Sequence, residues 1–154
     1  VALGRWDGQI DILDIVSGES LQQLKVRSTA WPLAISDDGH FVAAFTNTQG
    51  LILLDRRAPG TAGASASGRL LWPANGARVA FLRFSPDGRR LLAGMEDGLV
   101  RAWNSRTGEE LMVLETGDPR VSALDISADG SSLVTVGRDE CVKIWQCLWP
   151  SMSE

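Results

Sequence analysis

The sequence predicts an all-β fold built from repeated groups of short antiparallel strands. A Ser-x-Asp-Gly tetrad occurs at residues 36–39, 85–88 and 127–130, at intervals of 49 and 42 residues. Each tetrad follows one short apolar phrase and precedes another, as expected where a tight turn joins two strands. The 16 glycines among 154 residues suit a protein with many such turns. Self-similarity at this spacing is typical of repeat proteins.

The three tetrads predict hairpin turns, because Gly adopts a positive φ at no steric cost. The strands expected before and after these turns lie at 30–35 and 41–46, at 79–84 and 90–95, and at 121–126 and 132–137. Each repeat is therefore expected to start with a pair of antiparallel strands.

A third strand in each repeat is indicated by four further apolar phrases. These lie at residues 10–14, 51–55, 99–104 and 141–146, and fourth strands are expected at 20–25, 69–72 and 110–115. Leu13, Leu54, Trp103 and Trp145 hold equivalent places, at intervals of 41, 49 and 42 residues. Trp103 and Trp145 alternate with other apolar residues, so we expect their rings to be structural and to pack between neighbouring repeats.

With this period and these motifs, the sequence resembles the WD40-repeat β-propeller family over essentially the whole chain. Asp97-Gly98 and Asp139-Glu140 precede the two Trp strands where the family has its b–c turn, which implies structural roles for Asp97 and Asp139. The family's Trp-Asp pair survives only as Trp103-Asn104 and Trp145-Gln146. No histidine stands where the family's internal Asp-His-Ser/Thr-Trp network needs one, so we expect blade stability to depend more on apolar packing.

The resemblance implies four-stranded antiparallel blades, with strands a to d, in an incomplete ring. We expect a partial blade with strands b, c and d at 1–29, blades at 30–77 and 78–116, a blade without strand d at 117–147 and a C-terminal tail at 148–154. Residues 58–68 are rich in Gly, Ala and Ser and predict a surface loop inserted between strands c and d. The alternative is a phosphorylation site directed by Arg56-Arg57. Because these blades cannot close a ring, we expect the segment to be the C-terminal portion of a longer protein.

Composition and charge exclude several classes of protein. Hydrophobic residues make up 44% and charged residues 22% of the chain, and the net charge is −4. This balance excludes a disordered tail, a collagen-like fibre and a strongly basic nucleic-acid clamp. The apolar runs are far shorter than the roughly 20 residues that span a bilayer, and the N-terminus lacks the regions of a signal peptide. We therefore expect an intracellular protein, in the cytoplasm or in a cytoskeletal, ciliary or nuclear assembly, without a membrane partner.

The residues that catalysis would need are missing from the sequence. His40 is the only histidine, and no Gly-x-Ser-x-Gly or phosphate-loop motif is present. Cys141 and Cys147 lack the spacing of a metal site, and apolar packing is the expected role of both. We therefore expect no enzyme, with no catalytic residue, no cofactor and no metal.

Surface residues of one propeller face are the candidates for partner binding. The residues that come directly before the b–c turn acid or in the d–a loops of that face are Trp6, Arg27, Asn47, Arg78, Glu96, Arg120 and Arg138. Trp and Arg are the residue types most enriched at interface hot spots. The alternative is that Trp6 packs on its own blade and that the arginines pair locally with Asp118 or Asp139.

These features together favour a non-catalytic WD40 scaffold that mediates protein–protein interaction within a multiprotein assembly. Its expected partners are other proteins and the remainder of its own propeller. The alternative is a regulatory or targeting propeller domain of a large multidomain protein, such as an enzyme or a cytoskeletal or ciliary component. A third interpretation is recognition of a modified peptide or nucleic acid, although the acidic charge balance argues against nucleic acid.

Overall fold

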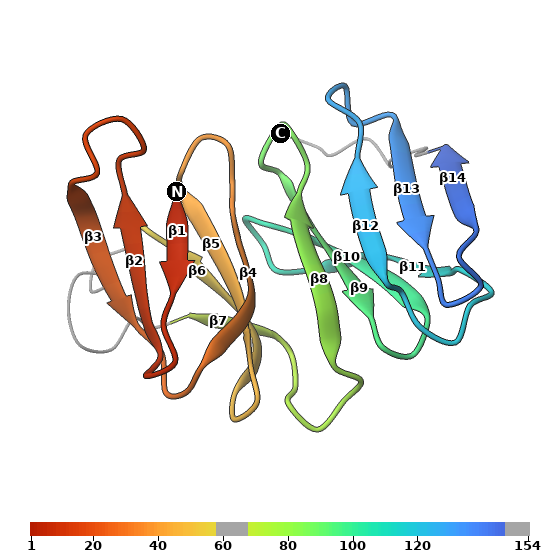
Figure 1. The fold of residues 1–154 in the computed structure, drawn as a ribbon, viewed down its shortest axis with the longest axis horizontal. Helices are drawn as coiled ribbons and strands as arrows, with labels where there is room; N and C mark the ends of the chain where they lie inside the picture. The colour runs from red at the N-terminus through yellow and green to blue at the C-terminus, as the bar shows by residue number, and fades with distance from the viewer. Residues whose placement is uncertain (58–67, 147–154) are drawn as a thin grey trace.

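A computed structural model describes residues 1–57 and 68–146, and these residues form strands and connecting turns without a helix (Figure 1). Their strands are β1 Ala2–Gly4, β2 Gln9–Leu13, β3 Ser20–Lys25, β4 Ala30–Ile35, β5 Phe41–Thr46, β6 Gly50–Asp55, β7 Arg69–Trp72, β8 Val79–Phe84, β9 Arg90–Met95, β10 Leu99–Asn104, β11 Glu110–Glu115, β12 Ala123–Ile126, β13 Ser132–Val136 and β14 Val142–Gln146. All paired strands are antiparallel. The predicted all-β class is confirmed.

The strands form four sheets in chain order: β1–β3, β4–β7, β8–β11 and β12–β14. Figure 1 shows these sheets side by side in an arc, with β1, β4, β8 and β12 toward the viewer. The structure thus confirms four-stranded antiparallel sheets in a ring that the described residues do not close. Of the expected insertion at 58–68 only Gly68 is described, and Cys147 and the expected tail at 148–154 lie outside the described residues.

The two central strands of the second sheet are buried on both faces, which explains their nearly continuous apolar sequence. Side chains alternate between the faces of a strand, so each strand contributes to two cores. Val42, Ala44, Ile52 and Leu54 pack with residues of the first sheet, including Ile10 and Ile12. Ala43, Phe45, Leu51 and Leu53 pack with residues of the third sheet, including Leu91 and Met95. The apolar cores therefore lie between neighbouring sheets.

The two c-strand tryptophans occupy different environments. Trp103 is 2% exposed and belongs to the core between the second and third sheets. Trp145 is only partly buried, at the edge of the core between the third and fourth sheets. Its indole Nε1 donates a hydrogen bond to Thr135 Oγ1 at 2.9 Å. One Trp–Thr link of the family's internal network therefore forms without the histidine.

The repeated tetrads form three nearly identical turns, as predicted. The Ser hydroxyls of Ser36, Ser85 and Ser127 donate hydrogen bonds to the Asp two residues later at 2.6, 2.5 and 2.6 Å. The Gly that follows has a φ of 65° to 71° in all three copies. This left-handed conformation favours glycine, so the Asp-Gly pair determines where each strand turns back.

We expect a pH effect at the third of these turns. The pKa of Asp129 is lowered to about 2, first by the hydrogen bond from the Ser127 hydroxyl and then by those from Ser131. A carboxyl group with a lowered folded-state pKa stabilises the fold above its unfolded value near 4, and this contribution disappears as the pH falls toward about 2. Ser127→Ala should therefore raise the pKa of Asp129. A carboxyl-carbon NMR titration measures this pKa, with Asp38 as the internal control that should not change; an unaltered Asp129 would contradict the expectation.

Candidate functional site

The turns between strands b and c and the loops between sheets lie together along the lower edge of the arc in Figure 1. We call this edge the b–c rim; it comprises residues 5–8, 26–29, 47–49, 73–78, 96–98, 116–122 and 137–141. All seven partner-binding candidates predicted from the sequence lie in these segments. The rim is therefore formed by seven chain segments from all four sheets.

Close packing of turns against loops positions these side chains. A Cβ added at Gly98, where φ is +83°, would lie 1.7 Å from the Asp118 carbonyl oxygen. A Cβ added at Gly8 would likewise lie 2.5 Å from the Val26 carbonyl oxygen. Only glycine lets the b–c turn approach the next loop this closely. The side chains before these glycines are thereby held beside the loop that follows.

Four of the predicted residues form two pairs, each of which joins a b–c turn to a neighbouring loop between sheets. Arg78 Nη2 donates a hydrogen bond to Asn47 Oδ1 at 3.2 Å, and Arg120 Nη2 lies 3.1 Å from Glu96 Oε1. The alternative that Arg120 pairs with Asp118 or Asp139 is wrong, since its carboxylate partner is Glu96.

Three of the predicted residues have side chains that are free to contact a partner: Trp6, Arg27 and Arg138. The Trp6 side chain is 89% exposed, so the alternative that it packs on its own blade is wrong. Its backbone carbonyl accepts a hydrogen bond from Thr29 Oγ1 at 2.8 Å, which ties the turn to the next loop. Arg27 and Arg138 are exposed, and their side chains make no hydrogen bond or ion pair with other described residues.

A partly buried ion pair that the sequence did not reveal supports the far end of the rim. Lys143 Nζ lies 2.5 Å from Asp118 Oδ2, 3.5 Å from Asp139 Oδ2 and 3.0 Å from the Thr116 carbonyl oxygen. The Asp118 side chain is 3% exposed. The hydrogen bond between Lys143 and Asp118 raises the pKa of Lys143 above its ordinary value. The hydrogen bond from the Cys141 backbone is the largest cause that lowers the pKa of Asp139.

The turn acids have the geometry of structural residues. Asp97 Oδ1 accepts a hydrogen bond from the Leu99 backbone nitrogen at 3.1 Å. Asp139 Oδ1 accepts one from the Cys141 backbone nitrogen at 3.0 Å. Both carboxylates therefore hold the chain at the start of strand c, which is the common geometry of Asp in turns.

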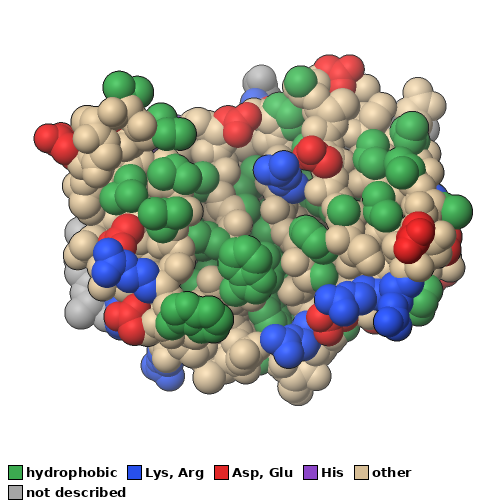
Figure 2. Space-filling model, viewed as in Figure 1, with side chains coloured by type: hydrophobic (Ala, Val, Ile, Leu, Met, Phe, Trp, Pro, Cys, Tyr) green, Lys and Arg blue, Asp and Glu red, His purple; other side chains and the backbone are tan. Residues whose placement is uncertain are grey.

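Trp31 is a surface residue that sequence reasoning missed. A tryptophan at the start of an apolar strand is ordinarily a packing residue, but the Trp31 side chain is 77% exposed on β4. Leu3 on β1 and Phe81 on β8 are 50% and 37% exposed. Figure 2 shows hydrophobic side chains spread over this face of β1, β4, β8 and β12. The Thr29 contact with Trp6 places the start of β4 beside the rim.

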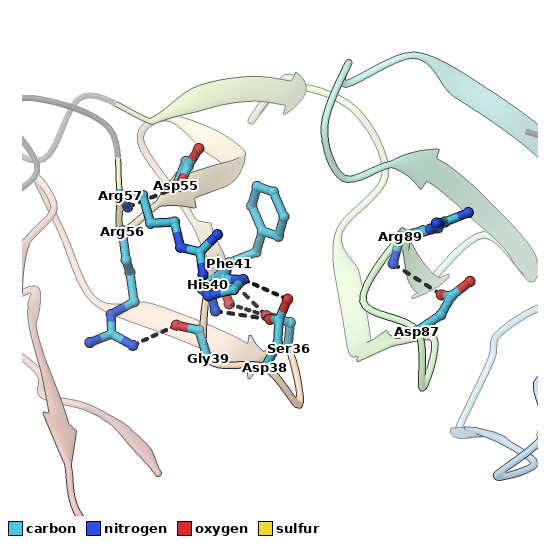
Figure 3. Close-up of polar contacts among 10 residues, drawn as sticks. All are labelled: Ser36, Asp38, Gly39, His40, Phe41, Asp55, Arg56, Arg57, Asp87 and Arg89. Carbon is cyan, nitrogen blue, oxygen red and sulfur yellow. Dashed lines mark hydrogen bonds and ion pairs between the residues drawn. The ribbon is translucent and has the colours of Figure 1, made fainter. Parts of the chain in front are cut away.

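The geometry around His40 does not provide a nucleophile. His40 Nδ1 lies 2.7 Å from Asp38 Oδ2, and the Ser36 hydroxyl donates to Asp38 Oδ1 at 2.6 Å (Figure 3). A catalytic serine must instead donate to the histidine that removes its proton. Here the Asp38 carboxylate contacts both the Ser36 hydroxyl and the His40 ring. The same Ser–Asp hydrogen bond recurs in the two tetrad turns that have no histidine. Ser36 therefore belongs to the turn.

Within residues 1–57 and 68–146, no group of three His, Cys, Asp or Glu side chains is arranged to hold a metal ion. Nor does that part of the chain contain a helix long and apolar enough to cross a membrane.

Comparison with known proteins gives consistent matches. The family model described as the anaphase-promoting complex subunit 4 WD40 domain matches residues 42–129. The chain is 37% identical over 67 residues to the guanine nucleotide-binding protein G(I)/G(S)/G(T) subunit beta-1 of Homarus americanus. It is 36% identical over 70 residues to WD repeat-containing protein 1 of Gallus gallus. Each match covers 44% of this chain, but only 20% and 12% of the two relatives.

A solved structure shows the same fold. The β-propeller domain of Myceliophteria thermophila Cps50 (Swd1) superposes with a TM-score of 0.75 at 16% identity. The superposition covers 94% of this chain and 47% of that one. The chain therefore spans less than half the length of each of these three proteins.

Proposed function

The chain belongs to the WD40-repeat β-propeller family, and from this premise we propose that it is a non-catalytic scaffold whose b–c rim holds another protein within a multiprotein assembly. The rim offers exposed aromatic and cationic side chains on closely packed turns. Such a surface is suited to binding a protein chain.

The exposure of Trp6 carries this proposal. A tryptophan ring that is 89% exposed leaves a large apolar surface in water. Trp31 is 77% exposed and lies two residues after Thr29, which hydrogen-bonds the Trp6 backbone. Two exposed, rigid aromatic rings on neighbouring chain segments give a partner much contact for little lost side-chain freedom. Trp6 and Trp31 are therefore the proposed centre of the interface.

The cations of the rim support an interface with charge complementarity. Arg27 and Arg138 are exposed and have no carboxylate partner among the described residues. The Arg78 guanidinium group donates a hydrogen bond to the neutral Asn47 amide and has no carboxylate partner among the described residues. A partner segment with acidic residues around an apolar side chain would match this distribution. Charges of this kind at the edge of an interface mainly guide association and orientation.

The bonds within the rim would keep the cost of binding low. The Arg78–Asn47 and Arg120–Glu96 contacts hold the loops in place before a partner arrives. A surface that is already ordered loses less conformational entropy on association. Asn47, Arg78, Glu96 and Arg120 are therefore proposed to support the interface, while Trp6, Arg27 and Arg138 contact the partner.

Site-specific crosslinking in the intact protein tests the proposal. A photoreactive phenylalanine analogue at position 6 should crosslink to another polypeptide. The same analogue at position 113, where Val113 is 47% exposed on the outer strand β11, should not. Crosslinks from position 6 to another part of the same chain would instead support the regulatory-domain alternative. Equal crosslinking from both positions would contradict an interface on the b–c rim.

Trp6→Ala should weaken binding of that crosslinked partner at least tenfold, because it removes the largest exposed side chain of the proposed interface. It should change the free energy of unfolding by less than about 0.5 kcal/mol, since the ring makes few contacts in the folded chain. Titration of the partner and urea unfolding measure the two quantities. Val113→Ala is the control that should leave the affinity unchanged. Unaltered affinity of Trp6→Ala would remove Trp6 from the interface.

A further inference from the structure

A second polar site lies on the opposite edge of the arc, between the second and third sheets. It is a cavity of about 250 Å³ bordered by the β4–β5 and β8–β9 turns and by the turns after β6 and β10. His40 and Phe41 form part of its wall on the side of the second sheet. It shares no residue with the b–c rim, so whatever binds there leaves the proposed interface free.

Three arginines from three different turns line this cavity: Arg57, Arg89 and Arg106. All three are exposed, and their side chains make no hydrogen bond or ion pair with other described residues. Figure 3 shows the Arg57 side chain directed toward His40 and Phe41. The Arg89 side chain extends to the side away from Arg57 in the same view. Because it is exposed and unpaired, it can turn toward a bound anion at a cost of side-chain entropy alone.

The carboxylates of the cavity already have partners. Asp38 pairs with His40 Nδ1 at 2.7 Å, and Asp87 pairs with Arg90 Nη1 at 3.2 Å. Asp55 accepts a hydrogen bond from the Arg57 backbone nitrogen at 2.9 Å. Burial raises the pKa of both Asp38 and Asp87, but the hydrogen bonds from Ser36 and Ser85 and the nearby positive charges outweigh it, so that both pKa values are lowered. Asp38 and Asp87 therefore stay ionised, and all three carboxylates already have hydrogen-bond or ion-pair partners, which leaves the guanidinium groups to bind an external anion.

The charged side chains at the cavity differ in their availability. Three arginines and three aspartates line it, so the lining as a whole is balanced. Arg56 and Arg90 are not part of the lining and already have partners, because Arg56 donates a hydrogen bond to the Gly39 carbonyl and Arg90 forms an ion pair with Asp87. The three lining arginines are therefore the charged groups that an external anion can bind.

We propose that this cavity binds the phosphate group of a phosphorylated serine or threonine in a partner peptide. A phosphate monoester carries about −1.5 to −2 charges at neutral pH and three acceptor oxygens. The planar guanidinium group is suited to two parallel hydrogen bonds with such oxygens. A nucleic acid or an anionic membrane would need a longer basic track than a single cavity between two sheets. The site therefore fits one phosphorylated side chain.

Calorimetric titration of the intact protein at low ionic strength tests the proposal. The probes are a short alanine-glycine peptide with one central phosphoserine, its unphosphorylated counterpart, inorganic phosphate and an oligothymidine. The phosphopeptide should bind with one-to-one stoichiometry and more tightly than inorganic phosphate, and the unphosphorylated peptide should not bind. Combining Arg57→Gln with Arg89→Gln should weaken phosphopeptide binding at least tenfold. Arg83→Gln is the matched control, because Arg83 is an exposed arginine already paired with Asp125 at 3.2 Å.

Each other outcome counts against the proposal. Equal affinity for inorganic phosphate and phosphopeptide would reduce the site to one for the free ion. Tighter binding of oligothymidine would assign it to nucleic acid. Equal weakening by Arg83→Gln would mean that only the overall charge matters. Circular dichroism of all variants verifies that they fold, as expected for substitutions of exposed side chains. These results do not depend on Trp6, so this proposal and the proposed function can fail separately.

Discussion

Trp103→Ala is expected to lower the free energy of unfolding by about 3–5 kcal/mol, as truncation of a large core aromatic does. Trp103 is 2% exposed and packs in the core between the second and third sheets, together with Leu53, Leu91 and Met95. Close packing on both sides leaves little room for the surroundings to collapse into the space that the ring vacates. Equilibrium urea unfolding of the intact protein measures the change.

Trp31→Ala is the matched control, because it removes the same ring from a position that is 77% exposed. Its expected effect is below about 0.5 kcal/mol. The loss in free energy of unfolding for Trp145→Ala should lie between those of the other two variants. Trp145 is partly buried, and the substitution also removes its hydrogen bond to Thr135. A loss below about 1 kcal/mol for Trp103→Ala would show that the core between the second and third sheets does not depend on this ring.

The strands and turns could be predicted because they depend on residues close together in the sequence. The tetrad at 36–39 contains both the Ser–Asp hydrogen bond and the glycine with positive φ that the turn needs. The expected strand at 90–95 coincides with β9. The strand expected from 121 begins only at Ala123, because the Val121 backbone nitrogen donates to the Met95 carbonyl of the neighbouring sheet. A contact between sheets therefore shifts the boundary that the local pattern predicts.

The exposure of Trp31 could not be predicted in the same way. The apolar phrase at 30–35 indicates a strand, but it does not say which of its faces is covered. The structure places β4 next to β1 and β8 on the near side of the arc (Figure 1). The Trp31 side chain on β4 is 77% exposed to solvent. Burial depends on which strands become neighbours, and this follows from the assembly of whole sheets.

The partners of the charged residues were predicted least well. The alternative to partner binding paired Arg120 with Asp118 or Asp139, but Arg120 pairs with Glu96, and Lys143 pairs with both aspartates. Several acids lie within reach of each cation, so the course of the loops decides among them. The close approach of Gly98 to the Asp118 backbone fixes that course, and spacing along the sequence does not encode it. One signal was present in the sequence. Side chains alternate along β14, so Lys143 lies on the same face of the strand as Trp145, which indicates that this lysine points toward the neighbouring sheet.

Lys143→Met is expected to reduce the folding equilibrium constant by about tenfold or more, because it leaves the buried Asp118 carboxylate without its cationic partner. The substitution keeps an unbranched side chain of similar length but leaves the Asp118 carboxylate, 3% exposed, without its cation. It also removes the donor to the Thr116 carbonyl and leaves Asp118 and Asp139 facing the same space. The expected loss is therefore mainly the cost of an unpaired buried charge.

The contribution of this ion pair should depend on pH in one direction. The hydrogen bond to Asp118 raises the pKa of Lys143 above its ordinary value of 10.5. A cation whose pKa is raised in the folded state stabilises the fold fully below the unfolded pKa, and this contribution disappears as the pH rises through the folded pKa. The difference in stability between the wild type and Lys143→Met should thus be constant near neutral pH and shrink above about pH 10.5.

Lys25→Met is the matched control, since Lys25 and Lys143 are the two lysines of the chain. Lys25 forms an ion pair with Asp7 at 3.1 Å, but the two side chains are 41% and 59% exposed. Exposed pairs of this kind contribute little, because water and salt screen them, so Lys25→Met should leave the urea midpoint nearly unchanged. Similar shifts for the two variants would mean that loss of a lysine charge, and not the stranded Asp118 carboxylate, causes the effect. A far larger shift for Lys143→Met would establish that the ion pair with the buried Asp118 carboxylate stabilises the end of the b–c rim.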